Sequence, residues 1–128
     1  MLYSKIEGEG KPFLIIHGFL GMSDNWKSIA AQFASEGFQI HSLDLRNHGK
    51  SFHSDEFNYT VMTQDVLEYC QANNLQKVSI IGQGYVGLTI SAFASKHFMV
   101  VGFDNNPKIA AQLNNGISHI EGVDSALI

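Results

Sequence analysis

The sequence lacks several features that mark specialised classes of protein. It has one cysteine, Cys70, so no internal disulfide can form, which fits a reducing compartment. It has no apolar run long enough for a transmembrane helix, about 18 residues, and its N-terminal stretch MLYSKIEGEG lacks the apolar centre of a signal peptide. The formal net charge of -4 argues against binding to nucleic acid or to an anionic membrane. We therefore expect a cytoplasmic protein without nucleic-acid or membrane partners.

Short apolar runs alternate with helix-like patterns along the 128 residues. The apolar runs predict buried parallel strands at 13–16, 38–43, 78–81 and 99–103. Helical spacing of apolar residues predicts helices at 23–36, 62–72, 86–97 and 107–115. This order predicts an α/β fold, a three-layer α/β/α sandwich with a mainly parallel, Rossmann-like sheet, in one domain that spans the whole chain.

The predicted strand order places strand 13–16 at the centre of the sheet. Strands 38–43 and 78–81 flank it, and residues 2–7 can pair beside 38–43. The chain changes direction between the flanking strands, which makes a topological switch point, where ligands bind at the carboxyl ends of the strands. We therefore expect the residues that follow the central strand and strand 78–81 to line that crevice.

Two loops in the first two-thirds of the chain share the pattern of one enzyme family. Residues 17–21 read His-Gly-Phe-Leu-Gly after a strand, and residues 44–51 read Asp-Leu-Arg-Asn-His-Gly-Lys-Ser after the next strand. His-Gly alone is also common turn chemistry, but both loops in order make residues 1–81 resemble the N-terminal part of α/β-hydrolases of the small acyl esterase type. The resemblance implies an oxyanion loop whose backbone N–H donates to developing negative charge. Its residues would be His17, Gly18 and Phe19, with the N–H of Phe19 as the donor.

The same resemblance implies a serine nucleophile that this sequence does not have. α/β-Hydrolases carry a G-x-S-x-G turn after the next strand, and here residues 82–87 read Gly-Gln-Gly-Tyr-Val-Gly. Gly84 stands at the serine position and has no hydroxyl group. The later acids and histidines, which match no triad motif of the family, are Asp104, Asp124, His97 and His119. We therefore expect no catalytic residue and a catalytically incomplete hydrolase part.

The glycine-rich turn also fits the dinucleotide-binding pattern G-x-G-x-x-G between a strand and a helix. In that pattern the first glycine allows a tight turn, the second leaves room for a pyrophosphate, and the third lets the helix lie close to the strand. Asp104 ends the following strand and would accept hydrogen bonds from a ribose, which favours NAD over NADP; alternatively it caps the next helix. The expected cofactor-binding residues are Gly82, Gln83, Gly84, Tyr85, Val86, Gly87 and Asp104.

The last third of the chain resembles a second family. Residues 81–88, 101–107 and 113–121 are similar to the NAD-binding start of nucleotide-sugar (UDP-sugar) dehydrogenases, a resemblance that covers residues 77–128. In that family the oxidation uses a cysteine and a lysine far downstream, which no residue here matches. Because the two resemblances overlap within strand 78–81, we interpret the chain as a chimera of the two families.

Other polar residues give weaker signals. His41, His48 and His53 have no metal-ligand spacing that we recognise, so we expect no metal site. Cys70 lies on the apolar face of its helix and is expected to be a core thiol. Arg46 is expected to brace its loop rather than to bind a phosphate.

These observations lead to one main hypothesis and two alternatives. The main hypothesis is a catalytically incomplete chimera whose glycine-rich turn binds NAD or another nucleotide weakly. The alternatives are a residual α/β-hydrolase (esterase) activity and a structural protein that binds no ligand. We also expect a homodimer through the open edge of strand 99–103, unless residues 117–120 fold back and cover that edge as a fifth strand.

Overall fold

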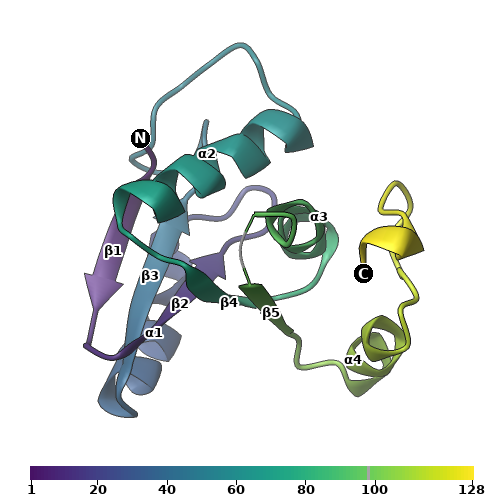
Figure 1. Cartoon of the computed structure of the whole chain (residues 1–128). Helices are drawn as coiled ribbons and strands as arrows, with labels where there is room; N and C mark the ends of the chain where they lie inside the picture. The colour runs from purple at the N-terminus through teal and green to yellow at the C-terminus, as the bar shows by residue number, and fades with distance from the viewer. Residues whose placement is uncertain (98) are drawn as a thin grey trace.

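A mainly parallel β-sheet forms the centre of the molecule. The computed structural model describes residues 1–97 and 99–128 (Figure 1). The strands of the described chain are β1 (Tyr3–Glu7), β2 (Lys11–Ile16), β3 (Phe38–Asp44), β4 (Lys77–Ile81) and β5 (Met99–Phe103). Their order is β1-β3-β2-β4-β5; β1 runs antiparallel to β3, and the other neighbours are parallel. The predicted central strand, its two neighbours and the pairing of the N-terminal residues are thereby confirmed.

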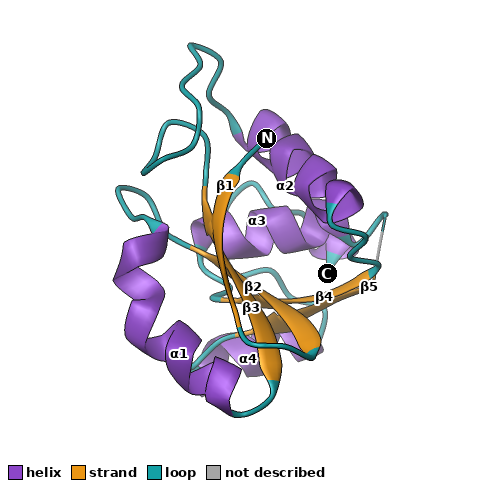
Figure 2. Ribbon diagram, turned by 90° about the vertical axis from the view of Figure 1, so that its left-hand side faces the viewer, coloured by secondary structure: helices purple, strands orange, loops and turns teal. Residues whose placement is uncertain are grey.

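Helices cover both faces of this sheet (Figure 2). The short helix η1 (Ser23–Trp26) and α1 (Lys27–Ser35) lie on one face, whereas α2 (Tyr59–Ala72) and α3 (Tyr85–Ala94) lie on the other. The remaining described helices are α4 (Pro107–Asn114) and η2 (Ser125–Leu127), which follow β5 in the chain. The predicted three-layer α/β/α sandwich is confirmed.

Two helix boundaries differ from those predicted by the apolar pattern. Helix α2 begins earlier, at Tyr59, because the side chain of Asn58 caps it by accepting a hydrogen bond from the N–H of Val61. Helix α3 ends at Ala94 and not at His97. The turn after it is tighter than an α-helix, because the N–H of His97 donates to the carbonyl three residues before it.

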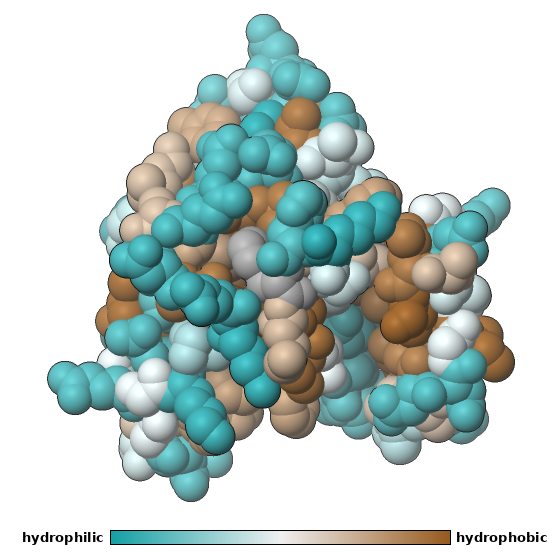
Figure 3. Space-filling view, viewed as in Figure 1, coloured by the Kyte–Doolittle hydropathy of each residue, from teal (hydrophilic) through white to brown (hydrophobic). Residues whose placement is uncertain are grey.

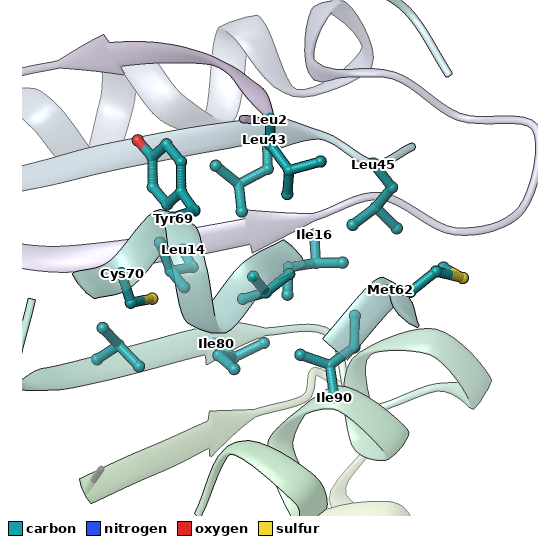
Figure 4. Packing of buried hydrophobic residues seen from close by; sticks show 12 residues of the cluster. Leu2, Leu14, Ile16, Leu43, Leu45, Met62, Tyr69, Cys70, Ile80 and Ile90 are labelled. Atoms are coloured by element: carbon teal, nitrogen blue, oxygen red, sulfur yellow. The ribbon is translucent and has the colours of Figure 1, made fainter. Parts of the chain in front are cut away.

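The main hydrophobic core lies between the sheet and helices α2 and α3. Successive side chains of a strand point to opposite faces, so Leu14 belongs to this core while Ile15 contacts the α1 side. Figure 4 shows Tyr69 and Cys70 of α2 directed at the sheet. Burial raises the pKa of the Cys70 thiol to about 11, so the thiol stays protonated and unreactive at neutral pH. The predicted core position of Cys70 is confirmed.

The C-terminal segment packs on α3 and does not extend the sheet. Ile120 and Val123 form a second, smaller cluster with Leu88 and Ala92 of α3. Figure 3 shows hydrophobic surface gathered where this segment, at the right, meets the rest of the molecule. Residues 117–120 form no strand, so the alternative in which they cover β5 is not observed.

Candidate functional site

A cavity opens at the carboxyl ends of β2 and β4. Its volume is about 570 Å³, and it lies at the switch point expected from the strand order. It brings the loop after β2 beside the turn after β4, two segments more than 60 residues apart in the chain. The lining residues are Ile16, His17, Gly18, Phe19, Trp26, Tyr59, Gly82, Gly84, Tyr85, Val86 and Gly87.

His17 holds the loop after β2 in a defined shape. Its side chain is buried, and burial lowers its pKa, so the ring is neutral. The Nδ1–H donates to the carbonyl of Gly18 at 2.8 Å, and Nε2 accepts from the N–H of Leu45 at 3.0 Å. The carbonyl of Gly18 and the N–H of Phe19 belong to one trans peptide and point in opposite directions. His17 therefore fixes the direction of the N–H of Phe19.

Asp44, at the end of β3, braces the neighbouring loop from inside. Its carboxylate accepts hydrogen bonds from the N–H groups of Ser23, at 2.5 Å, and Lys50, at 2.9 Å. Burial acts to raise the pKa of Asp44, but these hydrogen bonds outweigh it and lower the pKa, so the group is ionised. Gly49 has a φ of 52°, and a Cβ there would lie 2.1 Å from the carboxylate. The motif of residues 44–51 thus has a structural role.

Arg46 joins the same loop to helix α2. It forms two hydrogen bonds with the carboxylate of Asp65, at 2.5 and 2.8 Å, and donates to the carbonyl of Glu56 at 2.8 Å. The hydrogen bond to Asp65 raises the pKa of the guanidinium. The predicted loop-bracing role of Arg46 is confirmed, whereas its partner was not predicted. The sequence feature that could have pointed to this partner is Asp65, an acid beside the apolar face of α2.

The glycine-rich turn carries the chain from β4 into α3. Gly82 has a φ of 85°, and a Cβ on Gly87 would lie 1.8 Å from the carbonyl oxygen of Gly82, so both positions require glycine. Gly84 is the N-cap of α3 with a φ of -73°, and a Cβ there would meet no atom within 4 Å. The position that matches the family's serine therefore has room for a side chain. Next to it, the N–H of Tyr85 opens the helix without an intrahelical partner.

Gln83 and Asp104 lie outside the cavity lining. The carboxylate of Asp104 accepts from the N–H of Gln83 at 2.9 Å and from the N–H of Asn106 at 2.8 Å. Both of its oxygens are thus engaged by backbone N–H groups, one in the turn before α3 and one just before α4. The N-cap of α4 is Asn106, whose side chain accepts from the N–H of Lys108, so the alternative in which Asp104 caps that helix is not observed. The Gln83 side chain is buried against Gly102 of β5, and its amide donates to the carbonyls of Ile80 and Gly82 at 3.1 and 3.2 Å.

The histidines that were weighed as metal ligands take separate positions. His41 contacts the hydroxyl of Tyr69 at 2.7 Å, and His48 donates to the carbonyl of Arg46 at 2.9 Å. His53 lies in the loop before α2. Among the described residues, no group of three or more His, Cys, Asp or Glu side chains could hold a metal ion. No helix in the described part of the chain is long and apolar enough to cross a membrane.

The sequence matches the model of the alpha/beta hydrolase fold family over residues 11–112. It is 48% identical over 79 residues to a putative esterase/lipase of Haemophilus influenzae and 33% identical over 93 residues to a probable alcohol acetyltransferase of Wickerhamomyces anomalus. The matches cover 61% and 72% of this chain and 27% of each relative, so the chain spans about a quarter of their length.

Solved structures agree with the family match. An esterase of a marine microorganism superposes with a TM-score of 0.70 at 30% identity, covering 94% of this chain and 51% of that protein. An esterase from Exiguobacterium antarcticum, at 20% identity, shares the fold with a TM-score of 0.71 over 90% of this chain and 51% of its own. The chain belongs to the α/β-hydrolase family.

The prediction of an NAD-binding domain is wrong. The family match continues from residue 81 to residue 112, across the proposed junction, and the relatives are esterases and acetyltransferases. Nothing in the comparisons supports the resemblance of residues 77–128 to nucleotide-sugar dehydrogenases or the chimera inferred from it. The sequence signal misled because hydrolases also need a glycine-rich turn between this strand and this helix. The residue expected to bind ribose, Asp104, has both oxygens engaged by backbone N–H groups.

Two aromatic contributors to the cavity were not predicted as site residues. Trp26 ends η1, and Tyr59 opens α2. The two aromatic side chains stand at helix ends on opposite faces of the sheet, so only the folded chain brings them together. The sequence feature that could have identified them as site residues is their position just after loops that leave the carboxyl edge of the sheet.

Proposed function

We propose that this chain binds carboxylic esters in the cavity and hydrolyses them slowly. One observation carries the proposal: the cavity joins the loop of residues 17–19 to the start of α3. In the α/β-hydrolase arrangement, the N–H groups of Phe19 and Tyr85 then form the oxyanion hole. The esterase and acetyltransferase relatives support acyl chemistry at this place.

The reaction uses water as the nucleophile. Its oxygen bonds to the carbonyl carbon, the carbonyl electron pair moves to the oxygen held by the two N–H groups, and a proton leaves to solvent. When the intermediate collapses, the bond to the alcohol oxygen breaks, and the alkoxide takes a proton from water. An oxyanion hole and substrate binding without a triad retain about 10³-fold acceleration over water. Slow turnover is therefore the expected level of activity.

Gly84 and His17 explain why no faster route operates. Gly84 has no oxygen, so no acyl-enzyme forms there. Both ring nitrogens of His17, the imidazole that lines the cavity, are already engaged, so it has no lone pair free to accept a proton. Water activation consequently falls to solvent hydroxide.

The test is steady-state hydrolysis of p-nitrophenyl butanoate by the wild type and two variants of Phe19. Phe19→Pro removes the backbone donor, whereas Phe19→Ala keeps the donor and removes the ring. Loss of one oxyanion donor is expected to lower kcat by about 100-fold, whereas Phe19→Ala, which removes only a wall of the cavity, should raise KM and lower kcat far less. Wild-type turnover that does not saturate, or that equals the heat-denatured control, contradicts the proposal.

Three earlier expectations accompany this proposal. We propose that residues 1–128 unfold as one domain and that a homodimer forms through the edge of β5. The lone thiol, Cys70, supports a cytoplasmic location. The first two have tests of their own in the Discussion.

A further inference from the structure

A second hollow adjoins the cavity and shares three of its walls. Its volume is about 180 Å³, and we refer to it as the side hollow. The shared walls are Phe19, Tyr59 and Val86. The complete lining is Phe19, Phe57, Asn58, Tyr59, Met62 and Val86.

The walls of the side hollow suit a hydrocarbon group. None of the lining residues is charged, and the side-chain oxygen of its one amide, Asn58, already accepts from the N–H of Val61. The rings of Phe19 and Phe57 lie 6.5 Å apart. These two side chains are 72% and 41% exposed, which is unusual for large apolar groups gathered at one place and typical of a binding surface.

Met62 forms the deep end of the side hollow. It is 4% exposed and belongs to the main core, whereas Phe19, Phe57 and Tyr59 stand at the rim. A water-sized unit takes about 30 Å³, so 180 Å³ holds about six such units. A straight chain that enters past the rim therefore ends against the Met62 side chain.

From this geometry we infer that the side hollow binds the acyl chain of the substrate and that Met62 determines its greatest length. The inference rests on the proposed function, which places the carbonyl oxygen at the N–H of Phe19. The ring of the same residue is a wall of the side hollow, so a chain on the carbonyl carbon reaches the hollow directly. The alcohol departs through the open side of the cavity, while the acyl chain keeps its bond to the carbonyl carbon. The substrate class is esters of straight-chain acids of about seven carbons or fewer, with the carbonyl carbon in the cavity and the remaining carbons in the side hollow.

Binding of the product acids tests this inference independently of turnover. Trp26 is the single tryptophan and lines the cavity, so its fluorescence reports on ligands there. The probes are straight-chain carboxylates from acetate to decanoate, whose charged end suits the two N–H donors. Affinity is expected to rise about fourfold per methylene until the side hollow is full, and then to level off. An affinity that does not change with chain length overturns the inference.

Two variants locate the limit. Met62→Ala is expected to move the levelling point to longer acids, and Phe57→Ala, at the exposed rim, is expected to weaken every acid beyond acetate without moving that point. Met99→Ala, at a methionine on the far strand β5, is the matched control and should change nothing. A levelling point that stays in place in a folded Met62→Ala protein overturns the assignment of Met62. If that variant does not fold, Met62→Phe replaces it and should move the point to shorter acids.

A parallel ester series separates this inference from the proposed function. In p-nitrophenyl esters of increasing acyl length, kcat/KM should rise and level off at the same length as the affinity of the acids. In alkyl butanoates, where the alcohol chain is lengthened instead, kcat/KM should show no such limit. A limit along the alcohol instead of the acyl chain contradicts the inference while leaving the esterase proposal intact. If carboxylates bind with the expected length limit but no ester is hydrolysed, the proposed esterase activity is contradicted and the inference about the side hollow is not.

Discussion

The two ends of the chain are held in the fold in very different ways. Up to the end of β4, the loops are tied by buried polar groups, including the Arg46–Asp65 ion pair and the carboxylate of Asp44. After α3, by contrast, β5 is largely exposed and α4 contains no buried residue. The C-terminal segment is attached mainly through the small cluster on α3.

Helix α3 connects these two regions and also carries half of the candidate site. Ile90 belongs to the main core, while Leu88 and Ala92 face the C-terminal cluster. The loop of residues 17–19 on one side of the cavity therefore lies in the first region, and Tyr85 on the other side lies at the border. We expect changes in the first region to cost more stability than changes in the second.

The largest effect is expected from breaking the buried ion pair. Asp65→Ala leaves the guanidinium of Arg46 without its charged partner in a site where both side chains are about 10% exposed or less. Removal of one partner of a buried pair costs about 3–5 kcal/mol, measured by urea denaturation. Glu68→Ala, at an exposed acid on the same helix, is the control. A loss below about 1 kcal/mol would show that water already screens the pair.

A smaller loss of unfolding free energy is expected when a side chain of the C-terminal cluster is shortened. Ile120→Ala removes a side chain that is 5% exposed, and the cost should lie near the low end for such changes, about 2 kcal/mol. If the chain unfolds as one domain, circular dichroism and the fluorescence of Trp26, which lies in the first region, should shift together. A shift in circular dichroism alone would mean that the C-terminal segment unfolds separately.

Acid should weaken the first region through His17. Burial lowers the pKa of His17 in the folded protein below its ordinary value of 6.5. The stability that it contributes is therefore present above pH 6.5 and is lost as the pH falls through the folded-state pKa. Protonation also removes the Nε2 acceptor for the N–H of Leu45. The urea midpoint of the wild type should fall more between about pH 7.5 and about pH 5 than that of His17→Asn; equal falls would exclude His17 as the cause.

We predict that the protein self-associates through β5, whose outer edge is uncovered in the second region. Met99, Val101 and Phe103 of β5 are 60%, 40% and 52% exposed, and no described strand pairs with its outer edge. Val101→Lys places a charge on this edge, which discourages pairing between chains, and is expected to weaken dimerisation about tenfold, or 1.4 kcal/mol. Sedimentation over a range of concentrations measures it. A wild-type monomer at all micromolar concentrations contradicts the dimer.

The smallest effect on stability is expected at the border between the regions. Gly84→Ser places a hydroxyl at the N-cap of α3, where no atom obstructs a Cβ, and should stabilise the protein by a few tenths of a kcal/mol. No burst of acyl-enzyme should follow, because the imidazole in the cavity has both nitrogens engaged. Stopped-flow assays with p-nitrophenyl butanoate would detect a burst, and its appearance would reveal a base that acts on the new serine.

Much of the fold could be predicted because its signals are local. Four apolar runs predicted β2 to β5, and the loop motifs placed the cavity at the carboxyl edge of the sheet. The boundaries of α2 and α3 were less predictable, since they depend on the cap at Asn58 and on a tight turn near His97. The glycine-rich turn misled, because two unrelated families solve the same strand-to-helix problem with glycine.

By itself, the sequence determined the strand order around β2, the His-Gly loop after it and the absence of a hydroxyl at Gly84. These features depend on periodicity, turn chemistry and the identity of one residue, all of which are present in the chain before it folds. Only the tertiary structure decided that Asp65 pairs with Arg46, that Asp104 is engaged by backbone N–H groups, and that Ile120 packs on α3. These outcomes arise between segments distant in sequence, where burial and hydrogen bonding select one partner among several that the sequence permits.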